Sequence, residues 1–306
     1  MRAIGIDGGG SHTRFVLYDE ESGILNGFYI EIPGNYHLLG LERLKKVFKE
    51  GLKKVAEDRH FDVLGAGLSG VDRPYDIGLI SEIFRDLGIE DVVISSDAVA
   101  ALWGAVGGIG VLMVAGTGSI VIGRNAEGNV CRAGGWGYMF EEYCGGFWLV
   151  KRGTMAILDF KDGLGPPTTL EKEMLDFLGI KDTEGIIYNY YSDFSKSKIS
   201  SAARVVLREA EKGDEVSRNI VKEGIDGALK MISVVANRCN FGEYFTFSYT
   251  GGIFNSKYFL KEMKGAFKRT FPNASFVKPR FDADVGAAMM AIDWRRNNRG
   301  KIIWDV

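Results

Sequence analysis

The sequence contains little cysteine and little proline, with three cysteines and six prolines in 306 residues. Cys131, Cys144 and Cys239 lie far apart, and the three histidines do not cluster with them or with carboxylates at ligand spacing. Zinc sites and disulfide frameworks need close pairs, so we expect neither. Scarce, separated cysteines are typical of a reduced compartment, and we expect a cytoplasmic protein. A strand pattern begins at Ala3, which predicts that no signal peptide precedes the fold.

The sequence also lacks an excess of either charge, since 38 basic residues face 40 acidic ones. Proteins that bind nucleic acid through its phosphates carry surplus positive charge, so we expect no nucleic-acid partner. One uncharged stretch, residues 98–123, is long enough to span a bilayer. Its seven glycines lie in clusters that predict turns between short buried segments, and we therefore expect no membrane span.

Glycine, by contrast, is abundant, at 41 of 306 residues, against a usual share of about 7%. Glycine has no side chain and reaches backbone conformations that are closed to other residues. It is therefore used where the backbone approaches a ligand closely, and the glycine clusters are the candidate binding turns.

The first 107 residues predict a mixed α/β domain, in which three strands are followed by alternating helices and strands. The predicted elements are strands 3–7, 13–18, 24–32, 61–67 and 92–95 and helices 41–56, 77–87 and 98–106.

The chain then repeats this opening, with two strands around a glycine turn at 111–124. Later elements are strands 244–249 and 274–277 and helices 216–235, 257–268 and 285–294. We expect two domains, 1–107 and 108–284, with a ligand cleft between them. The second carries a helical insertion at about 145–239, and the segment 285–306 is predicted to pack back on the first.

The first glycine cluster, Asp7-Gly8-Gly9-Gly10-Ser11, lies between the first two strands. A hairpin turn is the simplest interpretation, but a hairpin needs only two such residues. Three glycines expose backbone N–H groups to an anion, and Asp7 is placed to hold Mg²⁺ through water.

Two further clusters follow. Gly116-Thr117-Gly118-Ser119 takes the same place in the repeat, which favours two turns that grip a polyphosphate, although no Walker motif is present. Residues 65–70 match GxGxxG. However, Pro74 predicts that the next helix begins beyond the motif, and the next strand ends too late, at Asp97. We interpret 65–70 as a substrate-side loop.

Three more positions are candidates. Asp97 follows a buried strand, where it is predicted to cap a helix and to turn its other oxygen toward substrate. Trp136, among Gly134, Gly135 and Gly137, fits core packing and ligand stacking equally well. Gly251-Gly252 joins a strand to a helix and leaves bare backbone for a nucleotide.

In this order, the motifs resemble the sugar kinase, heat-shock chaperone and actin superfamily, and within it the BadF/BadG/BcrA/BcrD-type ATPases, which include N-acetylglucosamine kinase. The matching segments are 7–11 and 116–119 (phosphate motifs), 96–98 and 284–288 (connecting motifs) and 251–252 (adenosine motif). Gly34-Asn35-Tyr36-His37 and 134–137 resemble N-acetylglucosamine or hexose kinases of this branch. The resemblance implies two ribonuclease H-like (actin-like ATPase) domains, each with a mixed five-stranded sheet.

The resemblance also implies a function, an ATP-dependent kinase that phosphorylates the 6-hydroxyl of a hexose or amino sugar, foremost N-acetylglucosamine. Asp97 would be the general base and Asp7 the Mg²⁺ ligand. The implied ATP-binding residues are Gly8, Gly9, Gly10, Ser11, Thr13, Gly116, Thr117, Gly118, Ser119, Gly251, Gly252 and Asn255. The implied sugar-binding residues are Asn35, Ser69, Gly70, Asp97, Thr117, Gly135, Trp136 and Glu142. We also expect a homodimer.

One segment departs from the family pattern, since Glu141-Glu142-Tyr143-Cys144-Gly145 stands where the family usually has Gly-Asp-Glu-Gly-Ser. Glu142 takes the place of the sugar-binding aspartate, which leaves the sugar open. The alternatives are a glucose or glucosamine kinase, an ATPase activator of 2-hydroxyacyl-CoA dehydratases, and a non-catalytic actin-like protein. Activators hold an iron–sulfur cluster through cysteines, and the lack of a close cysteine pair disfavours that reading. Asp97 disfavours a pure scaffold.

Overall fold

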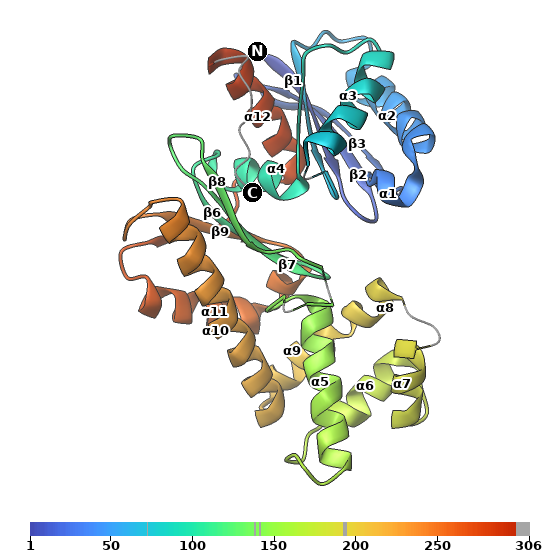
Figure 1. The fold of residues 1–306 in the computed structure, drawn as a ribbon, viewed down its shortest axis with the longest axis vertical. Helices are drawn as coiled ribbons and strands as arrows, with labels where there is room; N and C mark the ends of the chain where they lie inside the picture. Colours follow the sequence, from blue (N-terminus) through green and yellow to red (C-terminus); the bar gives the residue numbers. More distant parts are fainter. Residues whose placement is uncertain (72, 138, 141, 192–194, 298–306) are drawn as a thin grey trace. The chain divides into compact units, whose positions relative to one another are not determined.

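The computed structural model describes residues 1–71, 73–137, 139–140, 142–191 and 195–297. The strands of these residues form two five-stranded sheets (Figure 1). The strand order is β3-β2-β1-β4-β5 in the first and β8-β7-β6-β9-β10 in the second, so the same connectivity occurs twice along the chain. The predicted pair of five-stranded sheets is confirmed.

The first sheet combines an antiparallel meander with two parallel strands. Its strands are β1 (Arg2–Gly8), β2 (Thr13–Asp19), β3 (Gly23–Ile30), β4 (Val63–Leu68) and β5 (Val92–Ser95). β4 runs parallel to β1 and β5 parallel to β4, with Asp7 opposite Gly67 and Gly67 opposite Ser95. The carboxyl ends of these three strands therefore lie at one edge of the sheet, where ligands of α/β proteins bind.

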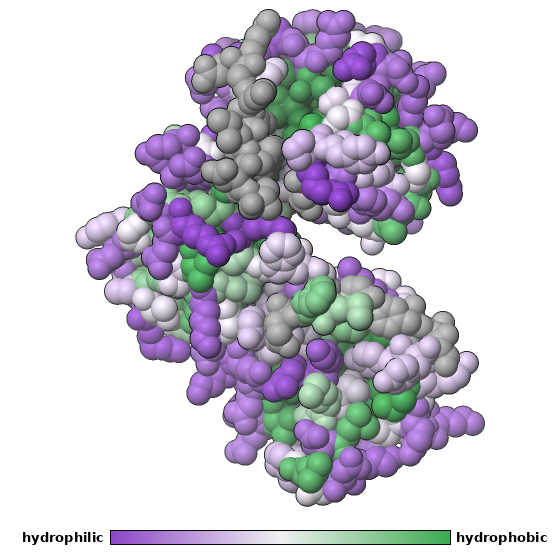
Figure 2. All heavy atoms as spheres, in the orientation of Figure 1, coloured by the Kyte–Doolittle hydropathy of each residue, from purple (hydrophilic) through white to green (hydrophobic). Residues whose placement is uncertain are grey.

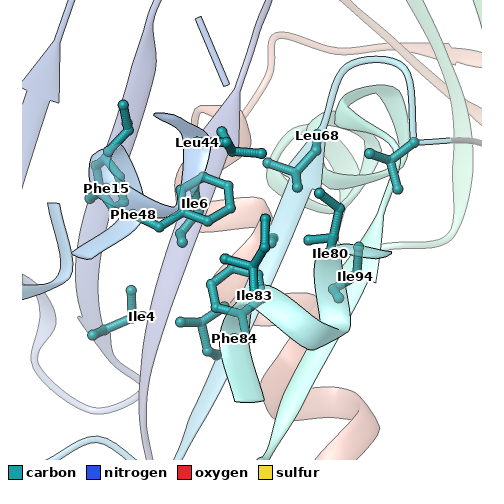
Figure 3. Packing of buried hydrophobic residues seen from close by; sticks show 14 of the residues in the cluster. Ile4, Ile6, Phe15, Leu44, Phe48, Leu68, Ile80, Ile83, Phe84 and Ile94 are labelled. Atoms are coloured by element: carbon teal, nitrogen blue, oxygen red, sulfur yellow. The ribbon is translucent and has the colours of Figure 1, made fainter. Parts of the chain in front are cut away.

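The hydrophobic core of this part lies between the first sheet and α2 (Leu41–Ala56) and α3 (Pro74–Asp86). Figure 3 shows Ile4 and Ile6 of β1 turned toward the apolar faces of both helices. The rings of Phe48 and Phe84 stack there with their centroids 5.1 Å apart. Apolar residues three or four apart on α2 form this face, as their spacing predicts.

The other face of the first sheet is covered by α4 (Asp97–Val106) and α12 (Ala283–Asn297) (Figure 1). The approach is close, because a Cβ at Gly5 would collide with the carbonyl oxygen of Asp284, and one at Gly65 with that of Ala287. Glycine at these two strand positions lets the helix backbone lie directly against the sheet.

The second sheet consists of β6 (Gly110–Ala115), β7 (Ser119–Arg124), β8 (Val130–Gly134), β9 (Thr246–Thr250) and β10 (Ser275–Phe276). The helices associated with it are α5 (Gly146–Lys161), α6 (Leu170–Leu178), α7 (Thr183–Tyr191), α8 (Lys196–Ser201), α9 (Ala203–Lys212), α10 (Glu215–Arg238), the 3₁₀ helix η1 (Gly252–Asn255) and α11 (Lys257–Thr270). The sequence analysis did not predict β8 or the short α1 (Tyr36–Leu39), and it predicted α5 to α9 only together, as a helical insertion. Short segments without a clear apolar alternation give little signal.

The chain forms two compact units. Unit 1 comprises Met1–Leu112, Ile122–Val130 and the chain from Val277 onward, and unit 2 comprises Met113–Val121 and Cys131–Phe276. This division runs through β6 and β7, and the boundary between residues 107 and 108 stays a prediction.

The uncharged stretch 98–123 folds as α4, β6 and β7. Among the described residues, no helix combines the length and the apolar character that a membrane span requires. On the face that Figure 2 shows, polar residues predominate in both units, with apolar residues in small groups between them. Small apolar groups are ordinary on protein surfaces and need no partner to explain them.

Candidate active site

The first glycine turn, between β1 and β2 in unit 1, is fixed at one end and open at the other. The carbonyl oxygen of Gly8 accepts a hydrogen bond from Ser69 N–H (2.8 Å), and that of Gly9 accepts one from Gly34 N–H (2.9 Å). A Cβ on Gly34 would collide with the Cα of Gly8, whereas a Cβ on Gly10 would meet nothing within 4 Å. The turn is therefore held by its first two glycines and presents the exposed Gly10-Ser11 end to a ligand.

Asn35, Ser69 and Gly70, predicted as sugar ligands, lie together beside this turn. Asn35 Nδ2 donates a hydrogen bond to Ser69 Oγ (3.4 Å), and Asn35 Oδ1 accepts one from His37 N–H (2.9 Å). The His37 ring lies with Nε2 3.3 Å from the carbonyl oxygen of Gly70. Gly70 has φ +79°, and a Cβ there would meet Asn35 and His37 at 3.0 Å. The result is a small polar cluster built from two loops.

Asp97 lies at the start of α4, beside the end of the strand β4 that leads to Ser69 and Gly70. Its Cα is 3.4 Å from where a Cβ on Gly67 would stand, at the end of β4. The sequence reading made Asp97 the helix cap, and that is wrong: Ser96 is the N-cap residue, and Asp97 is the first residue of the helix. One carboxylate oxygen of Asp97 still accepts a hydrogen bond from a first-turn amide, Ala98 N–H at 2.8 Å. The strand before it is too short to show from sequence where the helix begins.

Several carboxylates influence one another at this edge of unit 1. Burial, followed by the negative charges of Asp97 and Asp284, raises the pKa of Asp7 to about 7. Burial also raises the pKa of Asp284. Arg14 opposes both shifts, and its guanidinium pairs with Asp282 at 3.0 Å. A cation would relieve this concentration of negative charge.

A magnesium ion bound through water suits this arrangement. Among the described residues, no three His, Cys, Asp or Glu side chains are grouped to cage a metal directly. Mg²⁺ keeps several waters and needs only one or two carboxylates besides the phosphates of its nucleotide, so Asp7 fits the requirement.

The second glycine turn, Gly116–Ser119 in unit 2, is anchored on the start of α5. Gly146 N–H donates to the carbonyl oxygen of Gly116 (2.8 Å) and Phe147 N–H to that of Thr117 (2.9 Å). No hydrogen bond within the described part of the chain uses the N–H of Thr117 or Gly118. These two amides remain available to an anion.

The predicted adenosine turn lies directly beside this phosphate turn. Gly251 follows β9 with φ +103°, and a Cβ there would collide with the carbonyl oxygen of Ala115, at the end of β6. Only glycine allows the two strand ends to approach this closely. The turns after β6 and β9 thus become neighbours.

A pocket of about 780 Å³ opens on both turns. Gly116 and Thr117 line one part of it, and Gly252 and Asn255 another. The remaining wall comes from α8 and α9 and includes Ser200, Ser201, Arg204, Arg208 and Glu211. The hydroxyls of Ser200 and Thr117 are 3.3 Å apart, which links the α8 wall to the phosphate turn. The volume suits a nucleotide-sized ligand.

Trp136 is at the surface of unit 2, with 69% of its area exposed. Of the two interpretations that the sequence left open, core packing is excluded. The guanidinium of Arg132 lies 4.4 Å above the ring centre, and the N–H of Gly135 bonds to the carbonyl oxygen of Ser119 (3.0 Å). The loop is thus attached at its base and offers an aromatic face.

The model of the BadF/BadG/BcrA/BcrD ATPase family matches residues 4–291 of this chain. The chain belongs to this family. It is 31% identical over 301 residues to the N-acetylmuramic acid/N-acetylglucosamine kinase of Clostridium acetobutylicum, covering 94% of this chain and 97% of that protein. It is 30% identical over 314 residues to the N-acetyl-D-glucosamine kinase of Dictyostelium discoideum, covering 96% and 98%.

Solved structures share the fold. A protein of Chromobacterium violaceum, proposed to be an N-acetylglucosamine kinase, aligns with a TM-score of 0.75 at 22% identity, covering 95% of this chain and 98% of that one. A ROK family glucokinase of Streptomyces griseus, in complex with glucose and AMPPNP, aligns with a TM-score of 0.59 at 18% identity, covering 96% and 100%. At these identities the likeness concerns architecture.

The structure divides the residues matched to the family motifs between the units. Unit 1 holds Asp7, Gly8, Gly9, Gly10, Ser11, Thr13, Asn35, Ser69, Gly70 and Asp97, and unit 2 holds Gly116, Thr117, Gly118, Ser119, Gly135, Trp136, Glu142, Gly251, Gly252 and Asn255. Two of these side chains face inward. Thr13 is fully buried and donates to the carbonyl oxygen of Ile32, and Ser119 is 4% exposed and donates to that of Tyr143. Their hydroxyl groups therefore stabilise the turns through hydrogen bonds inside the protein.

Sequence reasoning did not single out several residues of the site. His37 and Asp284 lay inside matched motifs without a role of their own. Arg204 and Arg208 lie four residues apart on α9, and this short polar stripe was a signal that could have been used. Ser200 precedes them on α8. What the stripe faces depends on contacts with turns far away in the sequence.

Proposed function

We propose that the protein is an ATP-dependent sugar kinase that transfers the γ-phosphate to the 6-hydroxyl of a hexose or amino sugar, foremost N-acetylglucosamine. The observation that carries this is the unit 2 pocket between the phosphate and adenosine turns, in a chain that matches two N-acetylglucosamine kinases over nearly its whole length. The polar cluster of Asn35, Ser69 and Gly70 beside Asp97 supports an acceptor site in unit 1.

Each unit contributes a different part of the chemistry. In unit 2, the amides of Thr117 and Gly118 and the Thr117 hydroxyl bind the triphosphate, while the turn at Gly252 and Asn255 and the α9 wall bind the adenosine. In unit 1, Asn35, Ser69 and Gly70 orient the sugar, and Asp97 accepts the proton of its 6-hydroxyl as that oxygen attacks phosphorus. Positioning and charge stabilisation account for most of the rate in such transfers.

We propose that Asp7 holds Mg²⁺ through water. We also propose that the negative charge of Asp284, in the second connecting motif, attracts the same ion. When bound, the ion neutralises charge on the transferred phosphate. The raised pKa of Asp7 supports this role, because a carboxylate crowded by other negative charges gains most from a nearby cation.

We further propose a cytoplasmic homodimer with its domain boundary near residue 107. Scarce unpaired cysteine supports the location. Sedimentation at several concentrations tests the assembly, and a mass that stays at 33.7 kDa throughout would contradict it.

The dehydratase-activator reading has less support. Activators need thiolates that are accessible to an iron–sulfur cluster. Cys144 and Cys239 are buried, and burial raises the pKa of both thiols well above the usual range. Iron and sulfide in the protein purified without oxygen would reverse this preference.

A screen of ADP release tests the proposed function. The acceptors are glucose, glucosamine, N-acetylglucosamine, N-acetylmannosamine and N-acetylmuramic acid, each at equal concentration with Mg²⁺ and ATP. We expect the highest kcat/KM with N-acetylglucosamine. Mass spectrometry of the product, compared with 6-deoxy-N-acetylglucosamine as a non-reacting control, locates the phosphate. ATP binding without turnover of any sugar would contradict the proposal.

A further inference from the structure

Glu142, which takes the place of the family's sugar-binding aspartate, is buried and engaged with the backbone. Only 5% of its area is exposed. Oε1 accepts a hydrogen bond from Gly137 N–H (2.6 Å), and Oε2 accepts one from Ser119 N–H (3.3 Å). Ser119 belongs to the phosphate turn, and Gly137 to the turn that carries Trp136. One carboxylate therefore connects two turns of unit 2.

This carboxylate touches the phosphate turn and does not line the pocket. A Cβ on Gly118 would collide with Oε2 of Glu142, so the two groups are in contact. The described lining of the 780 Å³ pocket includes Gly116 and Thr117 but not Gly118, Ser119 or Glu142. A nucleotide in the pocket would therefore leave both hydrogen bonds of Glu142 in place.

The segment around Glu142 is itself held firmly. Ser119 Oγ donates to the carbonyl oxygen of Tyr143 (2.7 Å), and Gly145 N–H donates to that of Glu142 (2.9 Å). The ring of Tyr143 fills the space over Gly227 of α10, where any Cβ would collide with it.

Cys144 is anchored in the same way. It is buried with φ +65°, and its Sγ lies 3.0 Å from where a Cβ on Gly224 of α10 would stand. Glycines on α10 thus accommodate the two larger residues that depart from the family pattern. The contacts of Tyr143 and Cys144 with α10 fix the backbone next to Glu142.

We propose that Glu142 is a positioning residue that holds the phosphate turn and the Trp136 turn in a fixed relation, and that it is not a ligand of the sugar. The roles of these turns rest on the proposed function. An aspartate at this position, one methylene shorter, would reach only one of the two amides. The longer side chain thus explains how this chain departs from the family pattern without losing an ordered site.

Two substitutions, Glu142→Asp and Glu142→Gln, distinguish positioning from sugar binding. The measurement is the Kd of ADP by calorimetry with no sugar present, followed by kcat and the KM of the best sugar. Positioning predicts that both variants lose ADP affinity about 10-fold. Glu142→Gln removes the charge and leaves one acceptor oxygen for two N–H donors, and Glu142→Asp shortens the side chain that connects the two turns. Asp226→Asn, at an exposed site on α10, is the matched control and should leave the Kd unchanged.

The opposite result would overturn the proposal. If Glu142 binds the sugar, Glu142→Asp restores the family residue, leaves ADP affinity intact and changes only the KM of the sugar. A sugar screen without turnover would instead contradict the proposed function and leave the ADP measurement on Glu142 valid.

Amide exchange tests the connection by comparing the unmodified protein with Glu142→Gln. We expect slow exchange at Ser119 and Gly137, and faster exchange at both in Glu142→Gln. Gly146, whose N–H bonds to Gly116, is the internal control and should not change. Exchange of Ser119 and Gly137 at the rate of exposed amides in the unmodified protein would overturn the proposal.

Discussion

At the scale of single residues, the chemistry depends on carboxylates whose surroundings differ. Asp7 is half-buried near other acidic groups, Asp97 is half-buried at the start of a helix, and Glu142 is buried and bonded to backbone amides. We therefore propose three different roles for the same functional group, because burial and hydrogen bonding decide its charge and its freedom to act.

Replacing Asp97 with asparagine should lower kcat by about 100-fold or more, because the variant cannot accept the proton of the sugar hydroxyl. The Kd of ADP should stay nearly unchanged, because we propose that Asp97 acts on the sugar hydroxyl and not on the nucleotide. Asp86→Asn, which removes a surface carboxylate paired with Lys45, is the control. Full activity of Asp97→Asn with the best sugar would contradict the assignment of the base.

Asp7→Asn should change how stability depends on pH. The pKa of Asp7 is raised from 3.8 to about 7, so between these values the folded protein binds a proton more tightly than the unfolded chain. Its contribution therefore favours folding below pH 4 and is lost as pH rises to 7. With chelator present, the variant should be more stable than the original by roughly 2–4 kcal/mol at pH 8 and show no such gain at pH 4.

Urea unfolding at the two pH values measures this difference. Asp19→Asn is the control of opposite sign, because hydrogen bonds from the backbone N–H of Ser22, and then of Glu21, lower the pKa of that carboxyl. The stability from Asp19 is present above its unfolded pKa and is lost as pH falls. A gain for Asp7→Asn that is equal at pH 4 and pH 8 would contradict the raised pKa.

At the scale of elements, glycine decides which segments can touch. Gly5 and Gly65 let α12 lie on the first sheet, Gly251 brings β9 to the end of β6, and Gly227 receives Tyr143 on α10. These contacts place turns from distant segments beside one another within each unit. The abundance of glycine thus serves packing as much as it serves ligand approach.

Gly65→Ala should lower the free energy of unfolding by about 1–3 kcal/mol, because the added methyl group collides with backbone of α12 that cannot move aside freely. Gly78→Ala is the matched control. Gly78 lies on an exposed face of α3, where a Cβ meets nothing within 4 Å, and alanine should stabilise the helix by about 0.5–1 kcal/mol. Equal effects of the two changes in urea unfolding would show that the contact is unimportant.

At the scale of the whole molecule, the chain is two units that are not consecutive in sequence. The helix α12 belongs to unit 1, although it follows all of unit 2 in the sequence. The buried residues of α12, including Val285, Ala288 and Ile292, cover a face of the sheet whose strand β1 carries Asp7.

Deleting residues 283–306 should therefore destabilise unit 1 selectively. We expect hydrogen exchange to accelerate in β1, β4 and α4, while α10 and β9 of unit 2 keep their protection. Loss of protection throughout the chain would show that the units fold as one. Unchanged protection in β1 would contradict the role of α12.

Local patterns were enough to predict every strand but β8, the helices α2, α3, α4, α10, α11 and α12, and the positions of the glycine turns. The two five-stranded sheets were implied by the family resemblance. A periodic pattern of apolar residues, a proline or a glycine cluster determines the conformation of the residues next to it. Secondary structure of this kind can therefore be predicted from the sequence. The order of the motifs along the chain likewise led to the family, because each motif is local. Short segments carry too little pattern to be predicted from sequence. For this reason β8 was missed and the helix cap was placed at Asp97 and not at Ser96.

Only the tertiary structure decided which residues of each motif face a ligand. Thr13 and Ser119 turn inward, Trp136 turns outward, and Glu142 binds two backbone amides, although the resemblance implied a ligand for all four. The pocket wall of Ser200, Arg204 and Arg208 had no motif at all. The reason is physical: the direction in which a side chain acts depends on what packs around it, and those neighbours come from dozens to more than a hundred residues away.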